Sequence, residues 1–184
     1  MNKNLNLIRD MIRLIGDDSE RRGVLETPQR VIKSWDTLYS GYKKDPVSVF
    51  KIFEEEEKFD ELVLIENIEF FSVCEHHILP FFGKAHIAYI PDGPVIGASK
   101  LPRLLEIYCR RLQIQERIGK QVVRDIMKYL KPKGAACILE AQHLCMMARG
   151  IEKQNSVMVT SCLEGCFKDI PVRSELFNLI RRNK

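Results

Sequence analysis

The sequence predicts an α+β fold: an antiparallel sheet with helices packed on one face, preceded by N-terminal helices. Strand-like segments, rich in β-branched and aromatic residues, come in adjacent pairs rather than singly between helices. Segments with apolar residues at three- to four-residue steps separate these pairs and flank them. The 184 residues, 45% of them hydrophobic, suffice for one domain with a real core. We divide the chain into a helical arm and linker at 1–60 and a sheet domain at 61–184.

Two helices are expected in the arm. The first has apolar residues at helical spacing and then a glycine that stops it: Leu5, Ile8, Ile12, Ile15 and Gly16. The second starts at Thr27-Pro28, with the threonine as cap and the proline in the first turn. Its apolar residues share one face: Val31, Trp35 and Leu38. Residues 42–60 are expected to be a linker, since they contain Pro46 and an acidic run at 54–57 that is typical of solvated surface.

Four strands are expected, in two antiparallel pairs. Residues 62–73 and 84–90 make the first pair, with a short connection between them. A Pro-Asp-Gly-Pro turn at 91–94 closes the second of these strands. Residues 135–145 and 157–163 make the second pair, a hairpin.

Two further helices are expected between the strand pairs and one after them. Ser99 is expected to cap the first of them, whose buried stripe is Leu101, Leu104, Leu105, Tyr108 and Leu112. The second carries apolar residues at four-residue steps: Ile118, Val122, Ile126 and Leu130. The sequence Lys-Pro-Lys-Gly at 131–134 breaks it, and the last helix spans roughly 174–182.

The overall charge and the cysteine content narrow the functional classes. A formal charge of +4, from 29 basic and 25 acidic residues, is too small a bias for a nucleic-acid footprint and is compatible with an anionic small ligand. No apolar stretch is long enough to span a membrane, and the N-terminus does not have the pattern of a signal peptide. We therefore expect a cytoplasmic protein. Its six cysteines should be mostly reduced there, which favours metal ligation or burial over disulfides.

Two short clusters concentrate the chemistry of the chain. Residues 74–77 read Cys-Glu-His-His and residues 143–145 read His-Leu-Cys, and together they hold three of the four histidines. Cys74 and His77 are three apart, so in a turn a thiolate and an imidazole can converge on one ion. Side chains alternate along a strand, so His143 and Cys145 are expected to face the same way on the strand at 135–145. The four side chains can thus share one metal site.

The spacing leaves the division of labour open. A structural zinc would take four of the two cysteines and three histidines, whereas a catalytic zinc takes three and keeps one position for water. Spare imidazoles could then move protons near the ion. Which groups bind and which stay free does not follow from the spacing.

Further polar residues could bind an anionic ligand or simply be solvated. Glu116, between two helices, could accept two N–H bonds from a guanine-like edge. Ser99 and Lys100 at a helix start, with Arg103 one turn on, could hold an anion, and Arg149 follows the second cluster. The pattern alone favours solvated charge for two arm residues off the apolar face, Arg30 and Lys33.

At these motifs the chain closely resembles the GTP cyclohydrolase I family over about residues 8–182. The segments that carry the resemblance are Thr-Pro-Gln-Arg-Val at 27–31, Ser-Val-Cys-Glu-His-His-Ile-Leu-Pro-Phe at 72–81, Ile-Gly-Ala-Ser-Lys at 96–100, Arg-Arg-Leu-Gln-Ile-Gln-Glu-Arg at 110–117, Ala-Gln-His-Leu-Cys-Met at 141–146 and Arg-Gly at 149–150. Small departures are Ala98, Pro102, Cys162 and Cys166, none of which is a proposed ligand.

The resemblance implies a role for each candidate residue. Cys74, His77 and Cys145 would bind Zn²⁺, which leaves His76 and His143 as the acid/base pair. Glu116 would grip the guanine ring, with Gln115 beside it in the substrate site. The triphosphate and ribose contacts would be Ser99, Lys100, Arg103 and Arg149, together with Arg30 and Lys33 from a neighbouring subunit.

The resemblance also implies a reaction and an assembly. GTP and water would give 7,8-dihydroneopterin triphosphate and formate, the first step of tetrahydrofolate and pterin biosynthesis. The implied fold is the tunnelling fold, in which sheets of five subunits close into a barrel and two rings stack as a homodecamer, with active sites between subunits. Residues 61–184 would be its catalytic domain. The alternatives are another tunnelling-fold enzyme, or a non-catalytic nucleotide- or metal-binding relative on the same scaffold.

Overall fold

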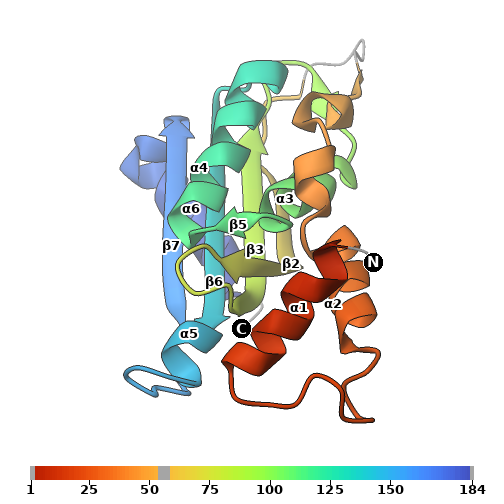
Figure 1. The fold of residues 1–184 in the computed structure, drawn as a ribbon. Coiled ribbons are helices and arrows are strands. Elements are labelled where there is room, and N and C mark those ends of the chain that lie inside the picture. Colours follow the sequence, from red (N-terminus) through yellow and green to blue (C-terminus); the bar gives the residue numbers. More distant parts are fainter. Residues whose placement is uncertain (1–2, 54–58, 183–184) are drawn as a thin grey trace.

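A computed structural model describes residues 3–53 and 59–182 (Figure 1). Its helices are α1 Lys3–Leu14, α2 Thr27–Leu38, α3 Lys100–Cys109, α4 Gln115–Asp125, α5 Leu144–Met147 and α6 Ile170–Arg181, with shorter or irregular helical segments η1 Ser40–Lys43, η2 Pro46–Val49, η3 Ile126–Leu130 and η4 Cys166–Lys168. Its strands are β1 Ile52–Phe53, β2 Val63–Cys74, β3 Pro80–Ile90, β4 Val95–Ile96, β5 Leu112–Gln113, β6 Gly134–His143 and β7 Met158–Gly165. Within the described ranges, no helix is both long and apolar enough to cross a membrane.

A five-stranded sheet in the order β5-β2-β3-β6-β7 forms the centre of the fold. The neighbours β2–β3, β3–β6 and β6–β7 are antiparallel, as expected, and only the short β5 runs parallel to the end of β2. Strand β3 pairs with β6 along its length, from Phe81 opposite His143 to Ile90 opposite Gly134. This register brings the end of β6 beside the turn that joins β2 to β3, so the two sequence clusters meet at one edge of the sheet.

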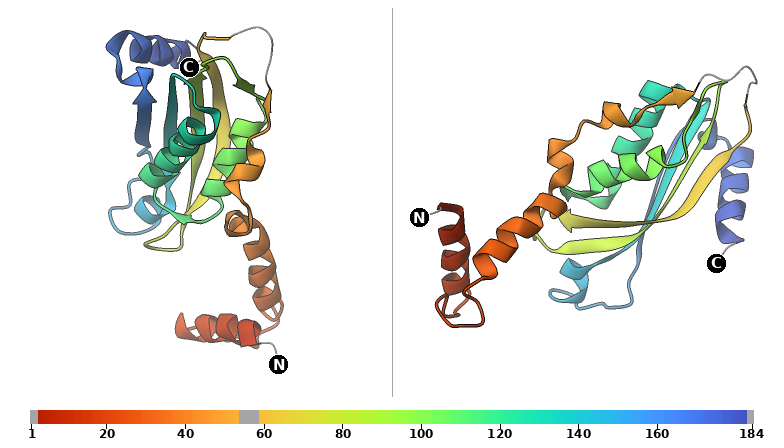
Figure 2. Two further views of the ribbon diagram at one scale, coloured as in Figure 1. Left: turned by 90° about the horizontal axis from the view of Figure 1, so that it is seen from above. Right: turned by 90° about the vertical axis from the view of Figure 1, so that its right-hand side faces the viewer.

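Side chains alternate along the central strands and build two separate cores. One face, with Ile87 and Leu139, packs against α3 and α4. The other face, with Ala88 and Ile138, packs against Leu176 of α6 and its neighbours. Figure 2 shows α6 and the pair α3 and α4 on opposite sides of the sheet. The α+β class is confirmed, but the expectation that the helices cover one face is corrected, because α6 buries its apolar stripe on the other face.

The N-terminal helices project from the sheet domain as an arm (Figure 2). Both expected helices are present, and Ile8 and Ile12 of α1 are buried. The expected apolar face of α2 is not covered within the chain, since Trp35 is 42% exposed. Thr27 is the first residue of α2 rather than its cap; Glu26 holds the cap position and makes no side-chain cap bond. The arm therefore presents apolar surface that its own chain leaves open.

Other local predictions need correction. Residues 42–60 are more ordered than a linker, because they include part of η1, all of η2 and the strand β1, which pairs with β4; the acidic run at 54–57 lies outside the described residues. Leu112 belongs to β5 rather than to the stripe of α3. The helix predicted through Leu130 is α4 followed by the π-helical segment η3, and it ends at Lys131, whose φ is 54°.

Candidate metal centre and active site

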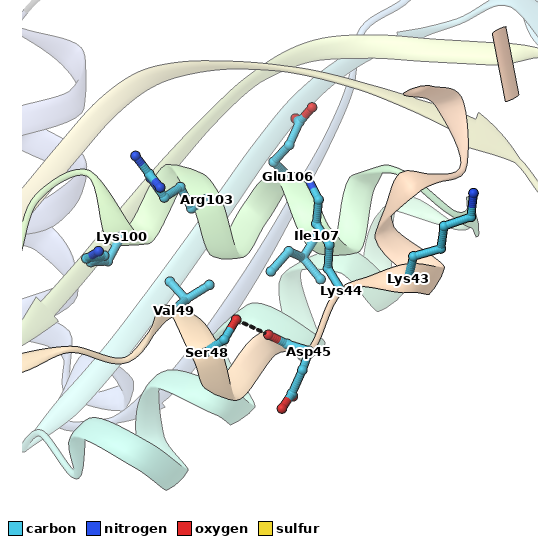
Figure 3. Close-up of a pocket in the computed structure, with 9 residues that line it drawn as sticks. All are labelled: Lys43, Lys44, Asp45, Ser48, Val49, Lys100, Arg103, Glu106 and Ile107. Carbon is cyan, nitrogen blue, oxygen red and sulfur yellow. Dashed lines mark hydrogen bonds between the residues drawn. The ribbon is translucent and has the colours of Figure 1, made fainter. Parts of the chain in front are cut away.

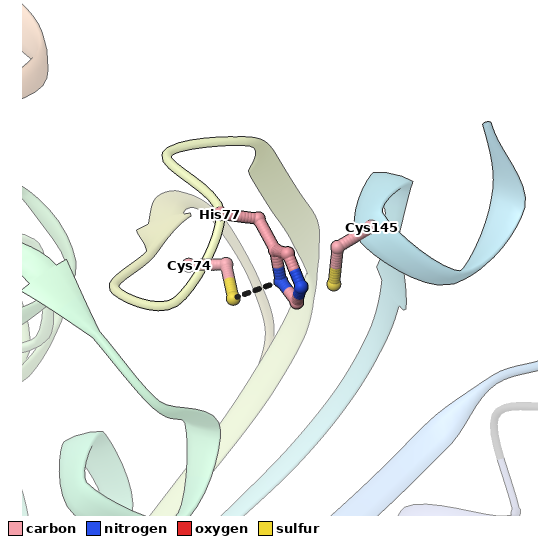
Figure 4. Close-up of side chains that lie close together, drawn as sticks. All are labelled: Cys74, His77 and Cys145. Atoms are coloured by element: carbon pink, nitrogen blue, oxygen red, sulfur yellow. Dashed lines mark hydrogen bonds between the residues drawn. The ribbon is translucent and has the colours of Figure 1, made fainter. Parts of the chain in front are cut away.

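Three side chains from the two sequence clusters converge on one point. Ligand atoms of Cys74, His77 and Cys145 all lie within 4.8 Å of one another. The Cys74 Sγ is 3.6 Å from His77 Nδ1. Figure 4 shows Cys74 and His77 on the β2–β3 turn facing Cys145 on α5. Segments about seventy residues apart in sequence thus form one compact group.

The backbone of the β2–β3 turn fixes the first two members of the group. The Ile78 amide donates to the Cys74 carbonyl at 2.9 Å, and the Cys74 amide donates to the Leu79 carbonyl at 2.8 Å. Ile78 has a φ of 55°, in the left-handed region, which costs a β-branched residue roughly 1–2 kcal/mol. The Glu75 amide donates to the Gln113 carbonyl of β5 at 3.0 Å. The turn is therefore tied to the sheet on both sides, with Cys74 and His77 on its inner side.

Cys145 reaches the group by a route that the sequence did not predict. Strand β6 ends at His143, and Cys145 lies in the one-turn helix α5. The two residues therefore do not share a strand face, and the alternation argument for them was wrong. Their convergence comes instead from the register of β6 on β3 and from the helical turn that follows it.

The donor set of the group fits a metal ion. Burial, and next the neighbouring Cys74, raises the pKa of the Cys145 thiol, so this thiol favours its neutral form until a cation is present. Two sulfurs and one imidazole nitrogen are ligands that Zn²⁺ prefers, and three protein ligands leave a coordination position open. The cluster of Cys74, His77 and Cys145 is consistent with a metal site.

His143 lies beside the group in a tightly defined environment. Its ring stacks on Phe81, with ring centroids 4.5 Å apart and planes at 4°. Its Nε2 is 2.9 Å from Gln115 Oε1. Burial lowers the pKa of His143, and the charge of Glu116 opposes this shift. Phe81 thus contacts the face of the imidazole and Gln115 its edge, and burial favours the neutral form of His143.

His76 and Arg149 also reach the group, with fewer contacts. His76 is exposed, with Nδ1 3.9 Å from Cys74 Sγ and Nε2 3.8 Å from a Glu75 oxygen. Arg149 donates to His77 Nε2 at 3.1 Å. His76 and Arg149 therefore lie against members of the group, whereas His143 precedes Cys145 by two residues and is held by Gln115 and Phe81.

A charged pair connects the turn to α4. Arg117 donates to both carboxylate oxygens of Glu75, with one of the bonds 3.0 Å long, and this arginine lowers the pKa of Glu75. Sequence reasoning missed Arg117, as well as the stacking of Phe81 on His143. Both residues lie within motif segments, at 110–117 and 72–81, but a motif does not tell which of its members touch.

Glu116 lies on the exposed start of α4, in the neighbourhood of His143. It lines a pocket of about 350 Å³ with Lys120, Thr160 and Ser161. Its carboxylate faces solvent while the adjacent Gln115 is buried, so the two neighbours point in different directions. Glu116 is available to a ligand that approaches His143 from the surface.

The remaining basic candidates are not gathered at the metal group of their own chain. Lys100 and Arg103 line a pocket of about 450 Å³ with Lys43 and Lys44 (Figure 3). They lie at the start of α3, whereas the end of α3 leads into β5, which pairs with Cys74. At 1.5 Å per residue, the helix sets Lys100 roughly 14 Å and Arg103 roughly 9 Å from its end at Cys109.

The two arm candidates and Ser99 are exposed. Arg30 pairs with Glu26 at 2.5 Å, and Lys33 lies on the same helix α2. Ser99 occupies the cap position of α3 but makes no side-chain cap bond, contrary to expectation. The structure therefore divides the predicted site into a compact group at the sheet edge and a set of exposed cations elsewhere on the subunit.

Comparison with known proteins points in one direction. The family model described as GTP cyclohydrolase I matches residues 5–181. A "GTP cyclohydrolase 1" of Wolinella succinogenes is 54% identical over 175 residues, covering 95% of this chain and 94% of the relative. One of Bacteroides fragilis is 47% identical over 177 residues, covering 96% and 91%. Among solved structures, the apo form of the archaeosine synthase QueF-Like covers 56% of this chain and is itself covered to 93%, with a TM-score of 0.45 and 16% identity.

Proposed function

The chain belongs to the GTP cyclohydrolase I family and shares its activity, and we propose that the group around Cys74, His77 and Cys145 is where its residues perform that reaction. The observation that supports this location is the convergence of the two sequence clusters at one sheet edge, with His143 and Glu116 beside them. The reaction is GTP plus water to 7,8-dihydroneopterin triphosphate and formate. The C8 carbon of the purine leaves as formate, and a sugar rearrangement and ring closure build the pterin.

Zn²⁺ is the ion that we assign to the group. Cys74, His77 and Cys145 would hold it, because two thiolates and an imidazole suit zinc better than magnesium or calcium. When bound, it supplies Lewis-acid activation of water. The turn bonds of Cys74 and the helical position of Cys145 orient these ligands before the ion arrives.

The two remaining histidines move protons in this proposal. His143 protonates N7 of the purine as water adds at C8, because it is the better fixed and the more buried of the two. His76, exposed on the turn, serves a later proton transfer. The opposite assignment of the two histidines is the competing version. In either case, replacing His76 or His143 by Ala blocks turnover while GTP still binds, and full activity of His143→Ala contradicts the role given to it.

The substrate is held at both of its ends. The Glu116 carboxylate accepts two N–H bonds from the guanine edge, which a surface carboxylate next to His143 is placed to do. Lys100, Arg103, Ser99 and Arg149 bind the triphosphate and ribose, and Arg30 and Lys33 add contacts from a neighbouring arm. Cations suit a triphosphate because charge-assisted bonds to phosphate are strong.

A homo-oligomer completes the site in this proposal. Lys100 and Arg103 lie far along α3 from the metal group, so one GTP reaches both sets more readily across a subunit boundary. Strands β2 and β7 lie near the two ends of the sheet, and the arm exposes Trp35 and other apolar side chains. These features support the tunnelling-fold decamer of two stacked pentamers, with residues 61–184 as the catalytic domain, acting in the cytoplasm.

A direct assay tests the activity. The protein is incubated with GTP, with and without a zinc chelator, while formate release and the fluorescent pterin formed after oxidation are measured. The expected result is both products without chelator and neither product with it. Tight GTP binding without formate would instead support a non-catalytic nucleotide- or metal-binding relative, although all five residues expected to be lost from an inactive relative are present: Cys74, His77, Glu116, His143 and Cys145.

A further inference from the structure

Gln115, which is 1% exposed, has hydrogen-bond partners on three sides of its amide. Its Nε2 lies 2.9 Å from the Leu139 carbonyl, 3.0 Å from the Met158 carbonyl and 3.1 Å from Thr160 Oγ1. Its Oε1 lies 2.9 Å from Nε2 of His143. The side chain at the start of α4 thus connects β6 and β7 to the histidine.

These contacts determine which end of the amide faces His143. Backbone carbonyls accept hydrogen bonds and never donate them, so the two next to Leu139 and Met158 require the NH₂ group of Gln115. A flipped amide would set its oxygen against both carbonyls, deep in the protein, where unpaired acceptors cost about 1–3 kcal/mol each. The oxygen of Gln115 therefore faces His143.

The orientation of the amide also sets the tautomer of the ring. An amide oxygen only accepts, so Nε2 of His143 must carry the hydrogen that it receives. In a neutral imidazole the other nitrogen then holds the lone pair. The flat stack on Phe81 prevents the ring from tilting away from this bond.

We propose that Gln115 is a positioning residue, whose oxygen fixes His143 with its proton on Nε2 and so makes Nδ1 the nitrogen that takes a proton from the adding water and passes it to N7 of the substrate. This inference rests on the proposed function, and it gives Gln115 a role other than substrate contact. It also names the reacting atom of His143. The hydrogen bond of one ring nitrogen decides which nitrogen of a histidine carries the proton. For histidines at metal sites, loss of such an orienting partner typically costs about 10- to 100-fold in activity.

Steady-state kinetics separate this role from substrate binding. Gln115→Met keeps the length of the side chain but removes the acceptor, and we expect kcat to fall about 10- to 100-fold with the Kd for GTP unchanged. Gln121→Met is the control, since Gln121 lies on the same helix α4 and its side chain bonds to Gln113 rather than to His143. It should lose thermal stability without that loss of kcat. A raised Kd for GTP in Gln115→Met would assign Gln115 to substrate contact and overturn the proposal.

A spectroscopic measurement keeps the proposal testable if Gln115→Met folds poorly. Solid-state ¹⁵N NMR of zinc-loaded, histidine-labelled protein resolves four histidines, and His143→Ala identifies the signal of His143. We expect a protonated Nε2 and an unprotonated Nδ1 in the unmodified protein, and a mixture of tautomers in Gln115→Met. A protonated Nδ1 in the unmodified protein would overturn the proposal. Absence of formate release from the unmodified protein would instead contradict the proposed function and leave the tautomer result standing.

Discussion

Arg117 on α4 donates hydrogen bonds to both carboxylate oxygens of Glu75, the residue between Cys74 and His76. The pair is partly exposed, so solvent screens it and it adds little to the stability of the fold. The pair also fixes geometry, because it joins the turn between β2 and β3 to the helix that carries Gln115 and Glu116. Glu75 had no assigned role from sequence, and this contact supplies one.

The first prediction concerns this pair. Arg117→Lys removes the two-pronged contact while keeping the charge, so the turn should lose its fixed orientation. We expect metal affinity and kcat each to fall about tenfold or more, with the melting temperature nearly unchanged. Competition with a chromogenic chelator and formate release measure the two effects. Arg21→Lys, which removes a similar two-pronged contact with Asp17 in the arm, is the control and should change neither.

The second prediction concerns the proposed metal ligands. Replacing Cys74 or Cys145 by Ser should reduce bound zinc to well below one ion per chain and abolish formate release, because a hydroxyl is a much poorer zinc ligand than a thiolate. Elemental analysis of the purified protein measures the zinc content. Cys162→Ser is the matched control, since Cys162 lies on β7 outside the cluster and should keep its zinc. Full zinc content in Cys74→Ser would contradict the proposal that Cys74 binds zinc.

The third prediction concerns the cations of α3. Lys100→Gln and Arg103→Gln each remove a charge from the pocket in Figure 3, and we expect KM for GTP to rise about 10- to 100-fold with a smaller change in kcat. The effect should shrink for a guanosine substrate analogue without phosphates in binding assays. Lys128→Gln, which loses a lysine over the Tyr129 ring, is the control. Equal losses for the phosphate-free analogue would contradict phosphate binding by these residues.

The fourth prediction concerns the hydrogen bonds that join Tyr108 of α3 to the end of α4. The Tyr108 hydroxyl donates to Asp125, and Arg124 donates to Tyr108 at 3.1 Å. Burial, then the neighbouring Asp125, raises the pKa of Tyr108 to about 12. Because the folded pKa exceeds the unfolded value of about 10, the stabilisation is complete below pH 10 and is lost as pH rises from 10 towards 12.

Tyr108→Phe tests these hydrogen bonds. It should lower the free energy of unfolding by about 1–3 kcal/mol at neutral pH, because Asp125 loses a buried partner. The stability difference between the original protein and the variant should be constant up to about pH 10 and narrow above it. Thermal unfolding at pH 7, 9 and 11 measures this; a difference that widens at pH 11 would contradict the shifted pKa.

Sequence reasoning predicted the strand pairs well because they depend on local pattern. The segment that became β2 was expected within one residue at each end, and the turn at 74–77 was placed between β2 and β3. The position of Cys145 was missed, because the end of a strand is decided by tertiary contacts rather than by alternation. The packing of α6 on the second face of the sheet was missed for a similar reason. The apolar residues of a helix show that one side of it is buried, but not which face of the sheet that side covers.

The candidate site was predictable in its composition and less so in its contacts. Residue types and spacing gave five candidate ligands in two segments, and the family resemblance singled out Cys74, His77 and Cys145, the three that the structure brings together. The contacts of Gln115 and Arg117 did not, because both depend on which neighbouring strand or turn their long side chains reach. The expected caps at Thr27 and Ser99 failed because cap residues are recognised by type while their bonds depend on backbone angles.

The separation of Lys100 from Cys74 along α3 bears on how damage spreads through an assembly. If the phosphate-binding residues of each active site come from an adjacent subunit, a substitution in one subunit inactivates the site of its neighbour. A mixture of two inactive forms, one lacking Cys74 and one lacking Lys100, would then regain activity, because random association reunites intact halves in about one centre in four. In a cell that makes two different variants of the chain, the activity of the mixed assemblies would equal neither the sum of the two separate activities nor the lower of them.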